Sequence, residues 1–478
     1  MAGTKDQKTK LFQPKSRVMG RTEHSWCRAV TCGTGVTVLG LQMTKPPFGI
    51  SVLHNVLAKL QSSHPLLGSK LHYDTSTKQF SFLNTDVAPP VKINSFDPSS
   101  TLELLKKLSD KGNSNNLSPF HLLLEHELNS NKWSDPSSFP SNGIDVMFAS
   151  VYTLPDAKCV IVLRFHTVIC DRTTAVSLLR ELMELAKDGD GGKDEVQKGI
   201  EIDTEGNLGI EDLIPSGLAK KTFWVHGMDM LGYSVNSLRL TNLKFKNVKW
   251  PRCSEVVRLQ MNTQDTDRIL VGCKSRGIKL CGALAAAGLI AAHSSKSNSD
   301  QTKKKYGVVT LTDCRSILEP PLSSHQFGFY HSAILNIHTV KGTESLWDLA
   351  KKSYMAFADY KKFNKHFSDM ADLNFLMCKA IENPGLTASS SLRSSFISVF
   401  EDPVFDNSNE MQKELGVEDY MGCASIHGVG PSIAIFDTVR GGELDCLCVY
   451  PSPLHSREQI NELVDHMKRV LIDASLIA

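Results

Sequence analysis

The sequence predicts a mixed α/β protein made of two lobes of similar size, each a sheet flanked by helices, with a channel between them. Apolar runs of strand length alternate with segments of helical periodicity along the chain, which favours this class. The 478 residues exceed one ordinary domain, and a stretch rich in Gly and Asp begins at Asp188. We therefore expect an N-terminal lobe over 1–187, with a flexible tail at 1–17. A crossover segment over 188–252 and a C-terminal lobe over 253–478 follow.

In the first lobe, Val, Thr and Cys enrich residues 25–43, which predicts one or two strands. Residues 49–61 have helical periodicity, and Pro65 marks the end of that helix because proline cannot continue it. The remaining expected elements are a strand from Ser69 with a hairpin partner over 78–83, a helix over 120–128 and a strand over 144–154.

The segment 158–187 predicts a strand, a short turn and a helix. An apolar run from Val160 to Phe165 ends on His166, and Asp171 follows five residues later. Apolar residues then recur at helical spacing, at Val176, Leu179, Leu182, Met183 and Ala186. An imidazole is expected at the end of the strand and a carboxylate at the start of the helix.

These two side chains have both chemical and structural interpretations. A histidine is largely neutral at pH 7, so His166 could accept a proton as a general base. A histidine at a strand end also serves in packing. Asp171 could hold the local geometry, and an aspartate before a helix is equally a favoured N-cap.

The second lobe repeats the mixture of helices and strands. Its predicted helices cover 263–274, 278–294 and 345–366, with a last helix after Ser456, and the crossover segment before it contains a predicted helix over 218–233. Its predicted strands cover 253–261, 306–313, 395–400, 432–438 and 444–450.

Composition excludes several classes of protein. Hydrophobic residues make up 41% and charged residues 22%, which is typical of globular proteins. The net charge of +2 gives no reason to expect nucleic acid as a partner. Twelve cysteines without metal-ligand spacing predict no metal site and a reducing, cytoplasmic location. The longest apolar candidate, 280–292, is too short for a membrane span.

The central unit resembles the active-site motif of coenzyme A-dependent acyltransferases with the chloramphenicol-acetyltransferase fold. These include the plant BAHD acyltransferases and the condensation domains of peptide synthetases. Three other segments are similar to segments of that family: LAKLQSSHPLLGSKLHYD at 57–74, TLTDCRSILEPPLSSHQFGFYHSA at 310–333, and the strand–turn–strand–helix ending at 432–467. The resemblance covers most of the chain.

This resemblance implies transfer of an acyl group from acyl-CoA, as co-substrate, to a hydroxyl or amine of a small molecule. By position, His166 resembles the catalytic base and Asp171 the structural acid, and Arg315 matches the arginine that pairs with that acid. Ser398 is a candidate donor to the oxyanion. The basic run at Lys303, Lys304 and Lys305 is a candidate for the CoA phosphates. No permanently bound cofactor is implied, and a monomer is expected.

The chain departs from the family pattern at three places. The family has three residues between His and Asp and a glycine after Asp, whereas four residues follow His166 and Arg172 replaces the glycine. The extra residue could be absorbed as a bulge, or it could turn His166 away from the channel. The Asp-Phe-Gly-Trp-Gly motif is absent, and Phe329 replaces the asparagine after Phe-Gly.

The sequence is also compatible with other kinds of protein. One is a non-catalytic binding or regulatory protein of the same fold, and another is a condensation-type enzyme that uses a carrier-protein thioester. A hydrolase with a Ser or Cys nucleophile is a third, although no Gly-x-Ser-x-Gly motif is present. His331, His427, Cys446 and Cys448 are weaker candidates for site residues.

Overall fold

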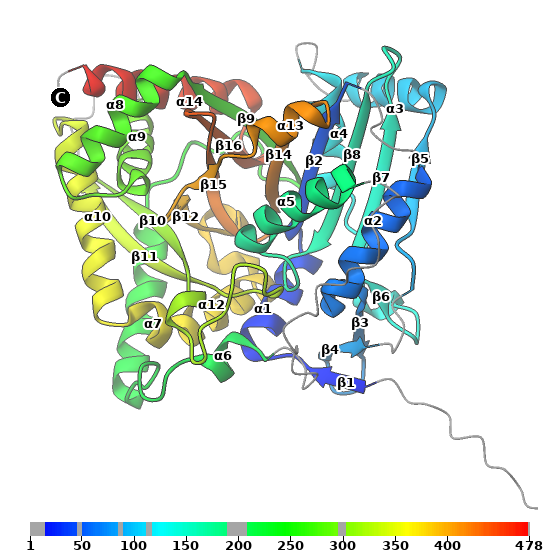
Figure 1. The fold of residues 1–478 in the computed structure, drawn as a ribbon. Coiled ribbons are helices and arrows are strands. Elements are labelled where there is room, and N and C mark those ends of the chain that lie inside the picture. The colour runs from blue at the N-terminus through cyan, green and yellow to red at the C-terminus, as the bar shows by residue number, and fades with distance from the viewer. Residues whose placement is uncertain are drawn as a thin grey trace, which may run out of the picture.

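The computed structural model describes residues 15–44, 50–84, 89–110, 117–188, 208–294 and 303–476. A five-stranded and a seven-stranded sheet form its two halves, and a four-stranded sheet lies at the edge of the first half. Figure 1 shows the five-stranded sheet on the right and the seven-stranded sheet on the left. The prediction of a mixed α/β protein with two lobes is confirmed.

The five-stranded sheet has the order β14-β2-β8-β7-β5. Its strands are β2 (Thr34–Met43), β5 (Ile93–Phe96), β7 (Met147–Thr153), β8 (Cys159–His166) and β14 (Val417–Ile426). The small sheet contains β1 (Lys15–Val18), β3 (Lys70–Asp74), β4 (Gln79–Asn84) and β6 (Ile144–Asp145). The helices of this half are α1 (Arg21–Thr31), α2 (Ile50–Ser63), α3 (Pro98–Asp110), α4 (Pro119–Leu128) and α5 (Arg172–Asp188).

The seven-stranded sheet has the order β11-β10-β12-β15-β16-β9, with β13 paired to β15. Its strands are β9 (Cys253–Met261), β10 (Lys304–Asp313), β11 (His331–Val340), β12 (Arg393–Phe400), β13 (Val404–Asp406), β15 (Gly430–Arg440) and β16 (Glu443–Ser452). The accompanying helices are α6 (Ile210–Leu213), α7 (Phe223–Arg239), α8 (Thr263–Ser275), α9 (Leu280–Ser294), α10 (Leu346–Lys362), α11 (Lys365–Ser368), α12 (Met370–Glu382) and α14 (Arg457–Ser475). The short helix α13 (Asn409–Glu414) packs instead against β14 and α5 of the first half.

One strand from the C-terminal half belongs to the first sheet. β14 pairs antiparallel with β2, with Tyr420 opposite Leu41 and Cys423 opposite Val38. The expectation that all of 253–478 would build the second lobe is therefore wrong for 417–426. Sequence spacing could not reveal this exchange, because a strand of this kind satisfies its backbone hydrogen bonds equally well in either sheet.

The start of the chain differs from the prediction too. Residues 25–31 belong to helix α1, and only Thr34–Met43 forms the expected strand. The Val and Thr content favours a strand only weakly, and packing decides here, because Cys27, Ala29 and Val30 are all buried in the helix. Gly33 follows with φ +102°, beside the His427 ring, where a Cβ would clash.

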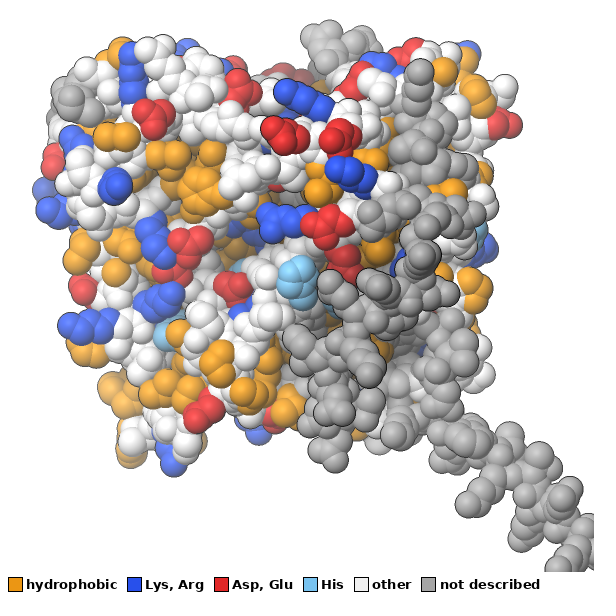
Figure 2. All heavy atoms as spheres, in the orientation of Figure 1, with side chains coloured by type: hydrophobic (Ala, Val, Ile, Leu, Met, Phe, Trp, Pro, Cys, Tyr) orange, Lys and Arg blue, Asp and Glu red, His pale blue; other side chains and the backbone are white. Residues whose placement is uncertain are grey.

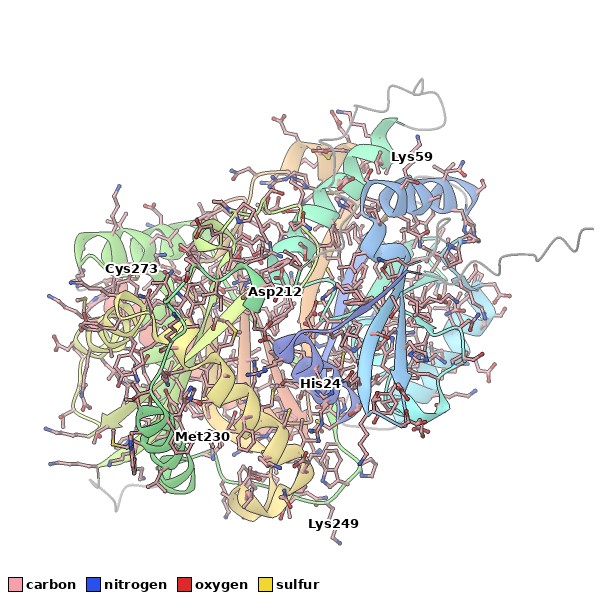
Figure 3. All side chains as sticks on the ribbon, turned by 90° about the horizontal axis from the view of Figure 1, so that it is seen from below. His24, Lys59, Asp212, Met230, Lys249 and Cys273 are labelled. Atoms are coloured by element: carbon pink, nitrogen blue, oxygen red, sulfur yellow. The ribbon has the colours of Figure 1, made fainter. Side chains whose placement is uncertain are left out.

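Elements of both halves meet near the middle of the molecule. Figure 3 shows His24 of α1 and Asp212 of α6 there, between Lys59 of α2 and Cys273 of α8. All twelve cysteines are free thiols.

Within the described ranges, no single helix has the length and apolarity needed to cross a membrane. The pair α8 and α9 meets that test together, bent by 107°.

A buried ionic cluster ties three elements of the first half together. Arg164 of β8 forms an ion pair with Glu127 of α4, and both side chains are at most 4% exposed. The Tyr152 hydroxyl of β7 donates to the other oxygen of Glu127. A buried pair of this kind adds little net stability while intact, but loss of one partner leaves a charge without compensation.

We expect Glu127→Gln to lower the free energy of unfolding by about 3–5 kcal/mol, because Arg164 would remain buried without a counter-charge. Urea denaturation measures this change. The matched control is Glu103→Gln, since Glu103 pairs with Lys107 on the exposed surface, where loss of the pair should have little effect on stability. Equal effects of the two substitutions would contradict the prediction.

Candidate active site

A cavity of about 470 Å³ lies between the two large sheets. The first half contributes Thr37 and Leu39 of β2 and one face of α5, and the second half contributes residues of β11, β12 and β15. Most of the lining side chains are aliphatic or aromatic, among them Leu179, Leu335, Met377, Phe400 and Phe436. Figure 2 shows charged side chains of both signs around the junction of the two halves on the face that it presents.

Asp171 begins helix α5 at the wall of this cavity. Its Oδ1 atom accepts hydrogen bonds from the backbone N–H of Thr174 at 3.1 Å and from the Thr174 hydroxyl at 3.2 Å. The first of these bonds satisfies one of the backbone N–H groups of the first turn that have no partner within the helix. Asp171 therefore is the N-cap that its position in the sequence suggests.

The other carboxylate oxygen of Asp171 connects the two halves. Oδ2 lies 2.9 Å from Arg315 Nη2, and it accepts hydrogen bonds from His331 Nδ1 and Tyr330 N, both at 3.0 Å. Burial alone would raise the pKa of Asp171, but the charge of Arg315 and the bonds from His331 and Tyr330 outweigh it and hold the pKa well below its usual range. The carboxylate is ionised at neutral pH.

Arg315 is held equally firmly. Its side chain is 3% exposed, and it pairs with Asp313 at 3.1 Å as well as with Asp171. Nη2 also donates to the Gln326 carbonyl at 3.1 Å. The structure thus contains the ion pair between Asp171 and Arg315 that the family resemblance implies, and the pair links the turn after β8 to the segment before β11.

His166 lies outside the cavity. Its ring is fully buried, and it contacts the Trp133 ring edge to face at 5.2 Å. Its Nδ1 accepts a hydrogen bond from the Val168 N–H at 3.3 Å, and Nε2 has no partner among the described residues. Burial lowers the pKa of His166 to about 3. A ring in this place does not meet an acceptor in the cavity, so its position does not suit the expected role of general base.

Thr167 takes the place expected for the base. Three residues separate Thr167 from Asp171, which is the family spacing, and Thr167 lines the cavity. The extra residue is thus not a bulge in the turn, because the motif counted back from Asp171 begins at Thr167. The sequence contained this signal, since a count from the acid rather than from the histidine reaches Thr167.

His331 is the imidazole that does line the cavity. It is the first residue of β11, and its side chain is 5% exposed. A carboxylate can only accept hydrogen bonds, so the bond to Asp171 places the proton of neutral His331 on Nδ1. The unprotonated Nε2 is then available to accept a proton. The acid was found in the sequence, but its histidine partner lies 160 residues away and was only a weaker candidate.

Of the other predicted residues, the serine lies at the cavity and the three lysines do not. Ser398 is buried and lines the cavity, on the same sheet as His331. Lys303 and Lys305 are exposed and Lys304 is half-buried, at the start of β10, and none of the three lines the cavity.

The weaker candidates other than His331 lie away from the cavity lining. His427 Nδ1 lies 3.0 Å from the Ser254 hydroxyl. Cys446 and Cys448 are fully buried in the second core, where burial raises the pKa of both thiols. A thiol in that setting is a poor nucleophile.

Arg172, which replaces the family's glycine, also lines the cavity. Nη2 contacts Asp437 Oδ1 at 2.9 Å, and Nη1 donates to the Asp402 carbonyl at 3.0 Å. Its guanidinium lies over the Phe400 ring, 4.2 Å from the centroid. Arg172 therefore links α5 to the second sheet at one end of the cavity.

A single acidic cluster in the described part of the chain has metal-like spacing. It consists of Asp229, Asp369 and Asp372. The Lys221 ammonium forms ion pairs with all three carboxylates. The position that a cation would take is thus occupied by a side chain.

Comparison with solved structures shows the fold. The TRI3 trichothecene 15-O-acetyltransferase from Fusarium sporotrichioides superposes with a TM-score of 0.68 at 10% identity, covering 97% of this chain and 95% of that one. The epimerization domain from the third module of tyrocidine synthetase B gives a TM-score of 0.61 at 12% identity, covering 98% of both chains. The first condensation domain of the calcium-dependent antibiotic synthetase gives 0.60 at 12% identity, covering 97% of both.

No family model matches the sequence, and no curated protein matches it. At such low identity the likeness concerns the fold alone. The chain has the two-lobed fold shared by condensation domains and acyltransferases, as its motifs predict.

The buried, neutral His166 makes stability depend on pH. Its pKa is about 3 in the folded protein, against about 6.5 in an unfolded chain, so its contribution is complete above pH 6.5 and is lost as the pH falls toward 3. Between pH 6 and pH 4 the free energy of unfolding falls as the pH is lowered. We expect this fall to be less steep in His166→Phe than in the wild type, by about 1.4 kcal/mol per pH unit.

Urea denaturation at a series of pH values measures this slope. His54→Gln, at an exposed position of α2, is the control and should leave the slope unchanged. A slope for His166→Phe equal to that of the wild type would show that the ring is not buried in its neutral form.

Proposed function

We propose that this protein transfers an acyl group from a thioester donor, acyl-CoA, to a hydroxyl or amine of a small-molecule acceptor in the cavity. The observation that carries the proposal is the pair of His331 and Asp171 on the cavity wall, 3.0 Å apart. An imidazole whose Nδ1–H is held by a buried carboxylate is the arrangement that a general base requires. The proposed base is therefore His331 in place of His166.

The reaction needs one base and no covalent acyl-enzyme. His331 Nε2 takes the proton of the acceptor as its oxygen or nitrogen attacks the thioester carbonyl carbon. The carbon–sulfur bond then breaks, and the proton passes to the leaving thiolate, so that the ester or amide and free CoA result. Asp171 stabilises the imidazolium formed on the way, and a positioned base contributes roughly 10²–10⁴-fold in rate.

Other residues of the cavity support this chemistry. The tetrahedral intermediate carries a negative oxygen that requires a donor, and the hydroxyl of Ser398 remains our proposed donor. The apolar lining keeps bulk water away from the thioester, which limits hydrolysis. It also favours an acyl chain or acceptor with a large apolar part.

Two other functions retain specific support. Thr167, at the motif position of the base, favours a protein of this fold that binds an apolar ligand without catalysis. The condensation domains among the structural neighbours favour a thioester donor on a carrier protein. Both functions use the same cavity. The first differs from the proposed function in having no turnover, and the second differs in its thioester donor.

We expect His331→Asn to reduce transfer by roughly 10²–10⁴-fold, because the amide can replace Nδ1–H toward Asp171 but cannot accept the proton. Release of free thiol from acetyl-CoA and octanoyl-CoA, with a panel of small alcohols and amines, measures the rate. The matched control is His166→Phe, which replaces the buried imidazole next to the motif and should stay within a few-fold of wild type.

Full activity in His331→Asn would overturn the assignment of the base. Loss of activity in His166→Phe alone, with an unchanged melting temperature, would restore His166 to that role. If the wild type releases no thiol but is stabilised by apolar ligands, the non-catalytic function is favoured.

A further inference from the structure

Two buried arginines lie at the end of the second sheet that is distant from His331. Arg393, at the start of β12, is 3% exposed and Arg252 is 6% exposed. Both guanidinium groups donate to the Ser391 carbonyl, from Arg252 Nη1 at 2.6 Å and from Arg393 Nε at 3.2 Å. Arg393 also donates to the carbonyls of Ile426, Gly428 and Pro431.

These two charges have no counter-ion in the protein. Within the described ranges, no carboxylate lies within ion-pair distance of either guanidinium, and carbonyl oxygens are their hydrogen-bond acceptors. The nearby His427 and His455 add no further positive charge, since burial and the adjacent arginines lower their pKa values to about 4 and about 3. A buried charge without a counter-ion is costly, so the site attracts an anion.

The cavity reaches this cluster. Both Arg393 and Ser395 line it. The Ser395 hydroxyl belongs to a residue that is 1% exposed, and it has no hydrogen-bond partner among the described residues. An unpartnered buried hydroxyl beside an uncompensated cation is an independent indication that a ligand group belongs there.

The geometry of β12 sets the length of such a ligand. The ring of Phe400, at the end of β12, lies 5.8 Å from the ring of His331. Arg393 begins the same eight-residue strand. At about 3.3 Å per residue, the two ends of this strand are separated by roughly 20 Å.

We propose that this end of the cavity binds an anionic group, a phosphate or a carboxylate, on a long ligand whose other end reaches His331. This proposal depends on the proposed function in one respect only, namely that the end of the ligand at His331 is the end that reacts. The pantetheine arm of a CoA thioester is a chain of comparable length that ends in phosphate.

Two matched pairs of probes test the charge of the ligand. The phosphate pair is 4′-phosphopantetheine and pantetheine, and the carboxylate pair is hexadecanoate and hexadecan-1-ol. Dissociation constants come from thermal melting and from calorimetry with the full chain. We expect the anionic member of at least one pair to bind about tenfold to a hundredfold more tightly to the wild type.

Variants separate recognition of charge from loss of structure. Arg393→Gln should abolish the preference, and Arg393→Lys should retain most of it while it preserves the cation. Ser395→Ala should weaken the anionic probe by a few-fold and leave the neutral probe unchanged, without removing any contact between strands. Preference in the phosphate pair alone identifies a donor arm, and preference in the carboxylate pair alone identifies an acidic ligand.

Equal affinity for both members of both pairs in the wild type would overturn the proposal and leave Arg393 as a link between backbone carbonyls. His331→Asn keeps this outcome distinct from the outcome for catalysis. That variant should keep the preference for anions even though transfer is lost. A wild type that transfers acyl groups without any such preference would retain the proposed function and reject the anion site.

Discussion

The ionised carboxylate of Asp171 is the contact on which the candidate site depends. One oxygen caps α5, and the other meets Arg315, Tyr330 and His331 from the opposite half. Burial of a carboxylate is unfavourable, and only this set of donors makes it tolerable. Because its donors come from the first turn of α5, from Arg315 and from the adjacent Tyr330 and His331, the carboxylate fixes the turn after β8, the segment before β11 and the orientation of the imidazole together.

The exchange of β14 has a related consequence for the cavity. β14 pairs with β2 in the first sheet, while β15, which follows it, pairs with β12 in the second. Because the chain passes directly from β14 in one sheet to β15 in the other, the two sheets cannot move apart without breaking strand pairs. The ion pairs of Arg258 with Asp419 of β14 and Asp445 of β16 reinforce this link. The walls of the apolar cavity at this junction are therefore held together by backbone as well as by side chains.

The sequence predicts what is local and misses what is not. The strand over Cys253–Met261 was predicted with its observed bounds, because its pattern, its flanks and its burial agree. Helix α1 was missed, since its Val and Thr residues favour strands until packing is considered. Asp171 and Arg315 were found through a motif. The spacing counted back from Asp171 does point to Thr167 in place of His166. The role of His331 depends on a contact between segments 160 residues apart, which spacing does not encode.

The position of the base relative to the acid, rather than its place in the sequence, determines whether proton transfer is feasible. His166 is adjacent to the motif but lies against Trp133, in a setting where a proton is unfavourable. His331 is remote in sequence but shares a hydrogen bond with the motif's acid and borders the space for a substrate. A chain could thus lose the usual histidine and keep the geometry, provided that another strand end supplies an imidazole to the same carboxylate. Because Asp171 is already ordered by Arg315 and by the cap of α5, such a replacement would need only one new side chain.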